Sequence, residues 1–567
     1  MSRRLLAVVL LVLLGALLPT PSGAQASAGL VRNADVVVES TDGTELSVRL
    51  FWLDSADPDP HPLVITAHGW GGSKADRYSH AAELARAGYT VITYDARGFG
   101  ASEGEVGLNG PDEVGDVSVL IDWALGLEND AAFDRVPPVA TGSDGDPLIG
   151  MTGISYGGAI QLLAAAADPR IDAIVPEITW SDLGDALAPG SVVNRGWIDL
   201  LFFFGMMSSH GATSASPDTD GMDQRLSEWY LAAYQTGRLP DEAKAALAER
   251  SPLGILPNIT AHTLLVQGYR DTLFVPDQAV TTYGALNGRT GSDTHLMLHN
   301  AGHGFSMTAT ERDRIRDVTL AFFAKHLKGD AVAENVPPVS YVAEGRWVSA
   351  ETWPPVATDG TIAPITSDSA TVVLQQSAAP SSHTQFAQFE EQADTGSQDT
   401  PLPTNVRLET GITGPVSWAG NPVVRLQVTP DVDDLTLFLS LVDSDGETSR
   451  VVQGQVVPLR IEDRAGETVD LEVALRGTAY TLPDGHRLLL RVATSDSAYL
   501  GGREAGTVTL ALDEATLTLP TGAIGEDSWS APVAVAQPPS KDAPGPAVVL
   551  VAFALLALSG VMRRLRK

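Results

Sequence analysis

A single serine framed by glycines is the first residue whose surroundings point to chemistry. The stretch GMTGISYGGAIQLLAAAA, residues 150–167, is apolar, then glycine-rich around Ser155, then helical in pattern. A serine hydroxyl is a poor nucleophile until a base removes its proton. The Gly-x-Ser-x-Gly pattern from Gly153 to Gly157 is typical of a sharp strand-to-helix turn that exposes such a serine. An ordinary glycine turn is the alternative, and we predict Ser155 as a nucleophile.

A base and a carboxylate should follow this serine in the chain. LLVQGYRDTLFVP places Asp271 just after a predicted strand, and HLMLHNAGHGFSM places His303 in a loop of small residues after the next one. The order serine, acid, histidine is that of one known kind of catalytic triad. His299, inside the strand pattern, and Asp277, at the start of a helix pattern, are the alternatives. The loop position favours His303 over His299.

Hydrogen-bond donors for a developing oxyanion are the remaining requirement. The backbone N–H of the residue after the nucleophile, here Tyr156, is the first expected donor. The second usually comes from an earlier strand–helix loop of the His-Gly type. AHGWGGSKADRYS supplies such a loop after a predicted strand, with Trp70 directly after His68 and Gly69. A second glycine turn without this role is the alternative.

The elements that must position these residues are those of a mostly parallel α/β sheet. From about residue 35 to 328, short apolar runs alternate with helical patterns. Between about residues 180 and 250 the alternation stops, and GWIDLLFFFGMM and RLSEWYLAAY predict inserted helices. Such an insertion lies over the strand ends, where open α/β sheets bind ligands. The strand patterns are PLVITAHG (62–69), YTVITYDARG (89–98), PLIGMTG (147–153), IDAIVPEI (171–178), AHTLLVQG (261–268) and DTHLMLHN (293–300).

A second region, from about residue 335 to 532, alternates Thr, Val and Leu between frequent Gly, Pro and Asp turns. Its strand patterns predict an all-β sandwich, and examples are VVRLQVTP, LTLFLSLVDSDG, HRLLLRVATS and TVTLALDEATLTLP.

Two features of this region could suggest a metal site. DSDGE from Asp443 lacks the ligand spacing of a calcium loop, and no second ligand-spaced histidine accompanies His486. We therefore predict no metal site.

Both ends of the chain carry targeting patterns. Residues 1–26 have the basic, apolar and small-residue regions of a secretory signal peptide, with a first membrane helix as the alternative. Residues 533–546 resemble a Pro-rich stalk, 547–562 form an uncharged apolar run, and 563–567 are basic. We predict an exported body anchored at the cell surface by a C-terminal transmembrane helix. A buried terminal helix or a processed sorting tail are the alternatives.

Composition excludes several classes of function. The chain has 37 Lys and Arg against 70 Asp and Glu, a net charge of −33. Such a surface repels a phosphate backbone, so no nucleic-acid partner is expected. The absence of cysteine excludes disulfides, thiolate metal sites and a cysteine nucleophile. Nothing in these patterns requires a cofactor.

The motifs together resemble the α/β-hydrolases of the cocaine esterase and X-Pro dipeptidyl peptidase superfamily, over about residues 35–530. The resemblance rests on YDARGFGASEG, GISYGG, LVQGYRDTLF and AGHG, and in the second region on PPVSYVAEGRWVSAETWPP, ETGITGP and YTLPDGHRLLLRVATSD, which resemble the family's jelly-roll domain. It implies that ester or amide bonds are cleaved through an acyl-enzyme. Ser155 would attack, His303 would carry the proton and Asp271 would orient His303, with the helical insertion as a cap lining the acyl pocket.

The resemblance also bears on the substrate. Several members use a tyrosine hydroxyl as the second oxyanion donor where this chain reads AHGWGG, so we expect the backbone N–H of Trp70 there instead. The dipeptidyl peptidases need carboxylates to hold a free amino terminus. A solvated or capping role is the alternative for every acidic candidate. The candidate substrate contacts in or beside the cap are Trp180, Glu177, Asp182, Asp185 and Asp199.

The sequence leaves two kinds of protein to weigh. One is a serine hydrolase acting on a small acyl ester, an amide or a short peptide, with esterase and peptidase as its variants. The other is a surface binding protein whose β domain does the work beside a catalytically idle hydrolase domain. The presence of Ser155, Asp271 and His303 together favours the hydrolase.

Overall fold

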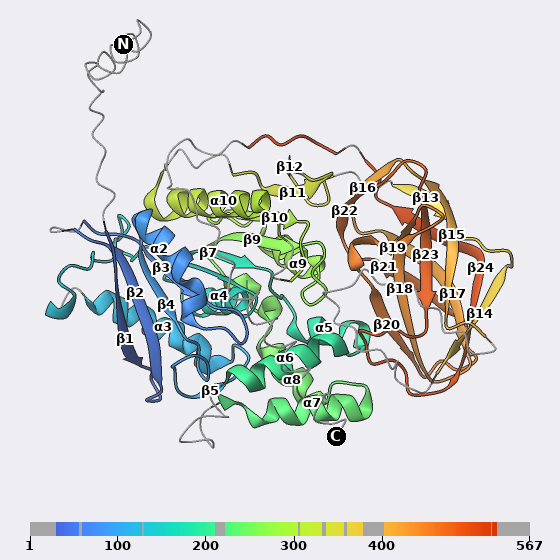
Figure 1. Ribbon diagram of the computed structural model, residues 1–567, viewed down its shortest axis with the longest axis horizontal. Helices are drawn as coiled ribbons and strands as arrows, with labels where there is room; N and C mark the ends of the chain where they lie inside the picture. The colour runs from blue at the N-terminus through green and yellow to red at the C-terminus, as the bar shows by residue number, and fades with distance from the viewer. Residues whose placement is uncertain are drawn as a thin grey trace, which may run out of the picture.

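The described part of the chain consists of an α/β region followed by a β-rich region (Figure 1). The predicted signal peptide, stalk, anchor and basic tail lie outside it. Within it, no helix combines the length and the apolar character needed to cross a membrane. The computed structural model describes residues 30–55, 59–127, 130–209, 221–303, 307–330, 336–355, 360–377, 402–522 and 524–529.

A ten-stranded sheet forms the framework of the first region. Its strand order is β1-β2-β4-β3-β6-β7-β9-β10-β11-β12. The pairs from β4 to β11 are parallel, whereas the outermost strands pair antiparallel. The strands are β1 (Val31–Glu39), β2 (Glu45–Leu53), β3 (Leu63–Ala67), β4 (Thr90–Tyr94), β6 (Ile149–Ile154), β7 (Ile171–Glu177), β9 (His262–Gly268), β10 (Thr294–His299), β11 (Val339–Ala343) and β12 (Arg346–Ala350).

Helices cover both faces of this sheet, which is why its central strands are buried along their length. Every residue of β3 and β4 is buried, as expected of parallel strands that lie between two helical layers. Helices α3 (Pro111–Gly126) and α4 (Tyr156–Ala167) pack on one face. Helices α2 (Tyr78–Arg86) and α10 (Ala309–Lys328) pack on the other.

Among the described residues between β7 and β9, four α-helices occupy the interval where the sequence predicts a cap. Figure 1 shows them at the lower edge of the α/β region, extending toward the β-rich region. The rings of Phe202 and Tyr230 stack 4.1 Å apart and join two of these helices. The helices are α5 (Leu183–Leu187), α6 (Arg195–Ser208), α7 (Gln224–Thr236) and α8 (Asp241–Glu249).

The second region is a sandwich of two sheets around one apolar core. The predicted α/β fold followed by a β-rich domain is therefore confirmed. One sheet has the order β13-β24-β17-β21 with β14 on β24, and the other β15-β23-β18-β19 with β20 on β18. These strands are β13 (Thr361–Pro364), β14 (Thr371–Gln376), β15 (Asn405–Thr413), β17 (Val423–Pro430), β18 (Asp434–Ser444), β19 (Ser449–Val451), β20 (Val457–Glu462), β21 (Val469–Ala474), β23 (Arg487–Ala493) and β24 (Gly506–Leu519).

Two stretches of the region predicted as the sandwich, 335–532, lie instead with the α/β region. β11 pairs parallel with β10, and β12 pairs with β11, so both extend the ten-stranded sheet. At the other end, residues 524–529 return to α10, where the Arg314 guanidinium lies 3.9 Å from the centre of the Trp529 ring. A strand pattern in the sequence reports burial but not which sheet the strand joins, so the pattern could not separate these stretches.

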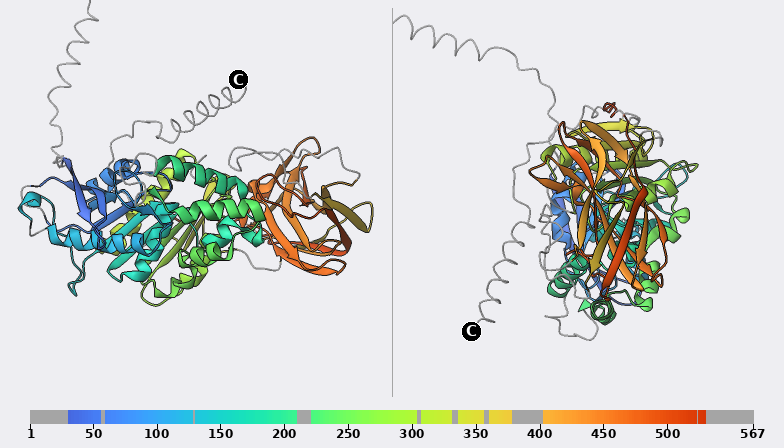
Figure 2. Two further views of the ribbon diagram at one scale, coloured as in Figure 1. Left: turned by 90° about the horizontal axis from the view of Figure 1, so that it is seen from below. Right: turned by 90° about the vertical axis from the view of Figure 1, so that its right-hand side faces the viewer.

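The sandwich lies against the cap, as the left view of Figure 2 shows. A turn of the cap, η5 (Pro189–Ser191), meets β20 so closely that a Cβ on Gly190 would lie 2.3 Å from the carbonyl oxygen of Pro458. Strand β18 is buried along all its length. Its Leu437 joins the core of the sandwich, whereas Phe438 packs with Val192 of the cap.

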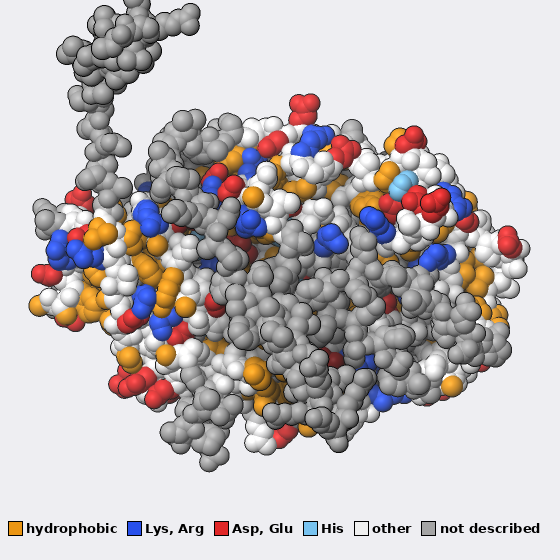
Figure 3. Space-filling view, in the orientation of Figure 1, with side chains coloured by type: hydrophobic (Ala, Val, Ile, Leu, Met, Phe, Trp, Pro, Cys, Tyr) orange, Lys and Arg blue, Asp and Glu red, His pale blue; other side chains and the backbone are white. Residues whose placement is uncertain are grey.

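Acidic and basic side chains are interspersed on the described surface seen in Figure 3. Many basic groups are paired with carboxylates. Arg170, for example, lies 2.6 Å from Asp168, and Arg314 lies 2.9 Å from Asp527. The basic side chains on this face therefore do not merge into one continuous basic surface.

Candidate active site

Ser155 stands alone at the junction of a strand and a helix. β6 ends at Ile154 and α4 begins at Tyr156. Ser155 has φ 55° and ψ −115°, a conformation that costs a non-glycine residue about 1–3 kcal/mol. A Cβ on Gly157 would lie 2.4 Å from the carbonyl oxygen of Ala67 at the end of β3. Only glycine permits this contact, so the sequence builds the sharp turn that the pattern predicts.

The structure brings Ser155, His303 and Asp271 into one hydrogen-bonded chain. Ser155 Oγ lies 2.9 Å from His303 Nε2, and His303 Nδ1 lies 2.8 Å from Asp271 Oδ2. A carboxylate oxygen accepts, so Nδ1 carries the proton and Nε2 is left to accept from the serine hydroxyl. This arrangement is the one in which a histidine can remove the proton of the serine.

Asp271 is fully buried and surrounded by donors. Its Oδ1 accepts from the backbone N–H groups of Leu273 and Phe274, both at 2.9 Å. Its Oδ2 accepts from Gln267 Nε2 at 3.1 Å in addition to His303. A buried carboxylate is costly unless its oxygens are hydrogen-bonded, and here each oxygen has two donors.

The alternative residues do not belong to this chain of hydrogen bonds. His299 is the last residue of β10, its Nδ1 accepts from the backbone N–H of Ala301, and burial lowers its pKa to about 4. Asp277 lies in the first turn of α9 (Pro276–Leu286) and accepts from Asn421 Nδ2. Each is therefore engaged away from Ser155.

The two expected oxyanion donors lie beside the nucleophile. Tyr156 is the first residue of α4, where a backbone N–H has no intrahelical acceptor. Trp70 lies inside a turn closed by the hydrogen bond from Gly72 N to Gly69 O, which leaves the N–H of Trp70 outside that bond. A Cβ on Gly69 would lie 3.8 Å from Ser155 Cβ, so this turn borders the serine.

A buried histidine fixes this turn, which the sequence motif did not reveal. His68 Nε2 accepts from the backbone N–H of Ala96 at 3.0 Å, so its Nδ1–H donates to Gly69 O at 2.8 Å. Burial lowers the pKa of His68 and favours this neutral form. The imidazole therefore ties the Gly69–Trp70 turn to the end of β4.

The side chain of Tyr156 is held by the buried carboxyl group of Glu113. Its hydroxyl donates to Glu113 Oε1 at 2.6 Å and accepts from the backbone N–H of Asn109 at 2.9 Å. Asn109 Nδ2 in turn donates to the backbone oxygen of Tyr156 at 2.8 Å. The Glu113 carboxylate also accepts from the backbone N–H groups of Gly107 and Gly110, but burial outweighs its donors and raises its pKa to about 7. The side chain of Tyr156 thus supports the turn at Ser155 without using its own backbone N–H.

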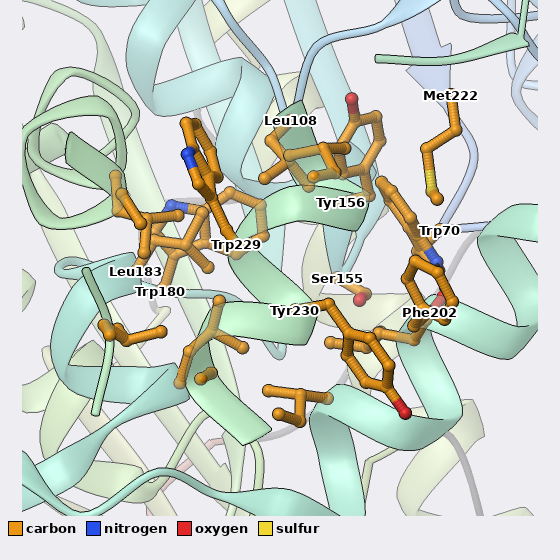
Figure 4. A pocket seen from close by; sticks show the side chains of 18 of the residues that line it. Trp70, Leu108, Ser155, Tyr156, Trp180, Leu183, Phe202, Met222, Trp229 and Tyr230 are labelled. Carbon is orange, nitrogen blue, oxygen red and sulfur yellow. Dashed lines mark hydrogen bonds between the residues drawn. The ribbon is translucent and has the colours of Figure 1, made fainter. Parts of the chain in front are cut away.

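Ser155 opens into a cavity beneath the cap (Figure 4). In Figure 4 the hydroxyls of Tyr156 and Tyr230 point away from Ser155. The indole N–H groups of Trp70 and Trp180 donate to backbone carbonyls. No acidic or basic side chain is among the described residues that line it. The lining residues are Trp70, Leu108, Ser155, Tyr156, Trp180, Leu183, Leu187, Ile198, Leu201, Phe202, Met222, Leu226, Trp229, Tyr230, Ala233, Leu239, Ala243, Leu247 and Phe274.

Of the candidate substrate contacts, Trp180 lines the cavity and the carboxylates do not. Asp182 caps α5 by accepting from the backbone N–H of Asp185 at 3.0 Å. Asp199 accepts from the hydroxyls of Tyr230 and Tyr234. Glu177 ends β7, and burial raises the pKa of its carboxyl. Asp185 itself accepts from Gln278 Nε2 at 3.3 Å.

One cluster in the described residues has the side-chain types of a metal site, His262, Asp293 and His326. None of the three lines the cavity at Ser155. His262 Nδ1 already accepts from the backbone N–H of Asp293, so its other nitrogen carries the proton. The Lys325 ammonium lies 2.7 Å from the Asp293 carboxylate. His262 and Asp293 are engaged in this way, whereas His326 Nε2 lies 3.7 Å from Asp293 Oδ2 and has no hydrogen-bond partner among the described residues.

Residues 42–305 match the X-Pro dipeptidyl-peptidase (S15) family, and residues 331–531 match the X-Pro dipeptidyl-peptidase C-terminal non-catalytic domain. An uncharacterized 31.7 kDa protein of Escherichia coli is 34% identical over 279 residues, which are 47% of this chain and 92% of that protein. The chain belongs to the S15 family. It is therefore a serine hydrolase.

Two further similarities extend over most of the chain. Cocaine esterase of Rhodococcus is 26% identical over 550 residues, covering 82% of this chain and 90% of that enzyme. The structure of an alpha-amino acid ester hydrolase superposes with a TM-score of 0.66 at 16% identity, covering 89% of this chain and 98% of that one. This S15 chain therefore shares both the hydrolase fold and the β-rich region that follows it.

Proposed function

We propose that this S15 protein hydrolyses carboxylic esters that carry a neutral, apolar group, through a Ser-His-Asp acyl-enzyme mechanism. The observation that carries the proposal is the hydrogen-bonded chain of Ser155, His303 and Asp271 at the floor of an apolar cavity. The membership of the S15 family supports the reaction class. The character of the cavity wall supports the substrate class.

In the proposed mechanism, Ser155 Oγ attacks the carbonyl carbon of the ester while its proton passes to His303 Nε2. Asp271 holds the Nδ1–H side of the imidazole and stabilises the imidazolium. The backbone N–H groups of Tyr156 and Trp70 donate to the oxyanion. The tetrahedral intermediate expels the alcohol, which takes the proton from His303 Nε2. Water, activated by His303, then releases the acid and regenerates Ser155.

The cavity favours esters over dipeptides with a free amino terminus. An ammonium group moved from water into an apolar cavity without a carboxylate partner loses its hydration and gains nothing in return. Two of the candidate carboxylates, Asp182 and Asp199, accept hydrogen bonds from other groups. Neutral acyl groups meet no such penalty, and each buried CH₂ contributes about 0.8 kcal/mol.

Dipeptidyl-peptidase activity is the second candidate, because the S15 family is described by it. This activity would need a carboxylate at the amino end of the substrate. Asp199, on α6, accepts a hydrogen bond from the hydroxyl of Tyr230, which lines the cavity. Activity on Xaa-Pro substrates would therefore direct attention to Asp199.

Export and anchoring are further parts of the proposal. The signal-peptide pattern of residues 1–26 and the apolar run 547–562 with its basic flank support a body held at the cell surface. Fractionation of cells that express the full chain, compared with a chain that ends before residue 533, tests this. Both proteins should be exported, and only the full chain should sediment with membranes.

The catalytic proposal is tested with the exported body and its Ser155→Ala variant. The substrates are p-nitrophenyl esters of increasing acyl length, amino-acid esters and Xaa-Pro p-nitroanilides. We expect hydrolysis of the neutral esters, with kcat reduced about 10⁴-fold or more in the variant. Cleavage of the anilides alone would replace the ester proposal by the peptidase. Equal behaviour of the two proteins on all substrates would contradict both.

A further inference from the structure

The loop that carries Asp271 is held from the second domain. We call residues 269–274 the acid loop. Gln455 lies between β19 and β20 of the sandwich and is 8% exposed. Its Nε2 donates to the backbone oxygen of Tyr269 at 2.7 Å and to that of Asp271 at 2.8 Å. The side-chain amide of Gln455 therefore binds the backbone carbonyl groups on either side of Arg270.

These two hydrogen bonds lie in a buried part of the protein. Tyr269 and Asp271 are fully buried, and a primary amide has two N–H groups, both of which are used here. A buried carbonyl that loses its donor pays the desolvation penalty in full. Without Gln455, the acid loop would have to move toward water or toward other donors, and Asp271 would move with it.

The sandwich also acts on the acid loop through the cap. The backbone of residues 193–196 is bonded to the sandwich by Leu500 N to Val193 O at 2.9 Å and Gly196 N to Ala498 O at 3.0 Å. The segment held in this way presents two donors to Thr272. They are Asn194 Nδ2, 3.1 Å from Thr272 O, and Trp197 Nε1, 3.0 Å from Thr272 Oγ1.

We infer that the sandwich positions the catalytic acid, and that Gln455 is the positioning residue through which it acts. This inference rests on the proposed function, in which Asp271 orients His303. Gln455 is not among the residues that line the cavity. Its loss should therefore lower kcat and leave KM nearly unchanged, because substrate binding does not use it.

The test uses the full chain with Gln455→Met, which keeps the length of the side chain and removes both donors. We expect kcat to fall about 10- to 100-fold, as for a misplaced catalytic group, with KM within about twofold. Asn421→Ala is the matched control, because Asn421 is also an amide of the sandwich that donates to the α/β region, at Asp277 and not at the acid loop. The control should keep wild-type kcat.

A double-mutant cycle separates positioning from a general structural effect. Residues that act as a unit are not additive. If Gln455 acts through Asp271, Gln455→Met should cause no further loss in an Asp271→Ala background. An equal loss in both backgrounds, or the same loss in the Asn421 control, would show a structural effect and overturn the inference.

The cycle also distinguishes the inference from the proposed function. Loss of activity in Asp271→Ala with none in Gln455→Met would overturn the inference alone. Full activity in Asp271→Ala would overturn the proposed triad, and the inference with it. Thermal unfolding of every variant shows whether the protein measured is folded at the assay temperature.

Discussion

The nucleophile and the acid of the proposed triad are held in place by different means. The turn at Ser155 is fixed by backbone atoms of its own sheet, because Gly157 lies against the end of β3. The acid loop is fixed by side-chain donors that come from the cap and from the sandwich, such as Gln455, 184 residues away from Asp271. The first device is local and is encoded by glycines. The second depends on the packing of two domains.

A methyl group added at Gly157, in the turn at Ser155, should have the largest effect. In Gly157→Ala the new Cβ would lie 2.4 Å from the carbonyl oxygen of Ala67, so the turn must shift. We expect a loss of about 3 kcal/mol in the free energy of unfolding and about 100-fold in kcat. Gly115→Ala in α3 is the matched control, because its Cβ meets nothing within 4 Å. Wild-type activity in Gly157→Ala would contradict this account of the turn.

The buried carboxyl of Glu113, which accepts from the Tyr156 hydroxyl, should make the stability of the folded protein depend on pH. The pKa of Glu113 is raised from 4.5 to about 7, mainly by burial. Between these values the folded protein binds more protons than the unfolded chain, so stability falls as pH rises. In Glu113→Gln this slope should be missing, a difference of up to about 3 kcal/mol. Unfolding in denaturant at pH 4.5 and 7 measures this difference in the free energy of unfolding. The same pH dependence in both proteins would contradict the role given to Glu113.

Removing one hydrogen-bond donor to the acid loop should have the smallest effect on kcat. Trp197→Phe removes the donor to Thr272 Oγ1 while an aromatic ring remains beside His303. A single hydrogen bond of about 1 kcal/mol corresponds to roughly fivefold in kcat. Thr272→Val removes the acceptor of the same bond, so the two losses should not add when combined. Additive losses would mean that the two residues act separately.

The comparison also explains how much of the site the sequence could reveal. The turn at Ser155 has a local pattern, and Asp271 and His303 follow it in a recognisable order at strand ends, so the sequence places all three candidates. Trp180 lines the cavity as expected. The carboxylate of Asp182 could be assigned either to substrate or to a helix cap from sequence alone, and the structure shows the cap.

The supports of these residues have no such pattern. Gln455 is one glutamine in a short loop of the second region, and its partners are backbone carbonyls that no residue type marks. His68 was visible as part of a His-Gly motif, but its two hydrogen bonds follow only from the approach of β4. The sequence pattern groups strands β11 and β12 with the sandwich for a related reason, because it does not indicate which strand each one pairs with.

The position of β11 and β12 has a practical consequence for anyone who divides the protein. A cut near residue 335, where the sequence suggests a border, would remove two strands from the ten-stranded sheet. The edge of β10 would then present unpaired backbone groups, a surface prone to pairing with other chains and to aggregation. A soluble fragment for crystallisation or for display should therefore retain residues through Ala350 at least.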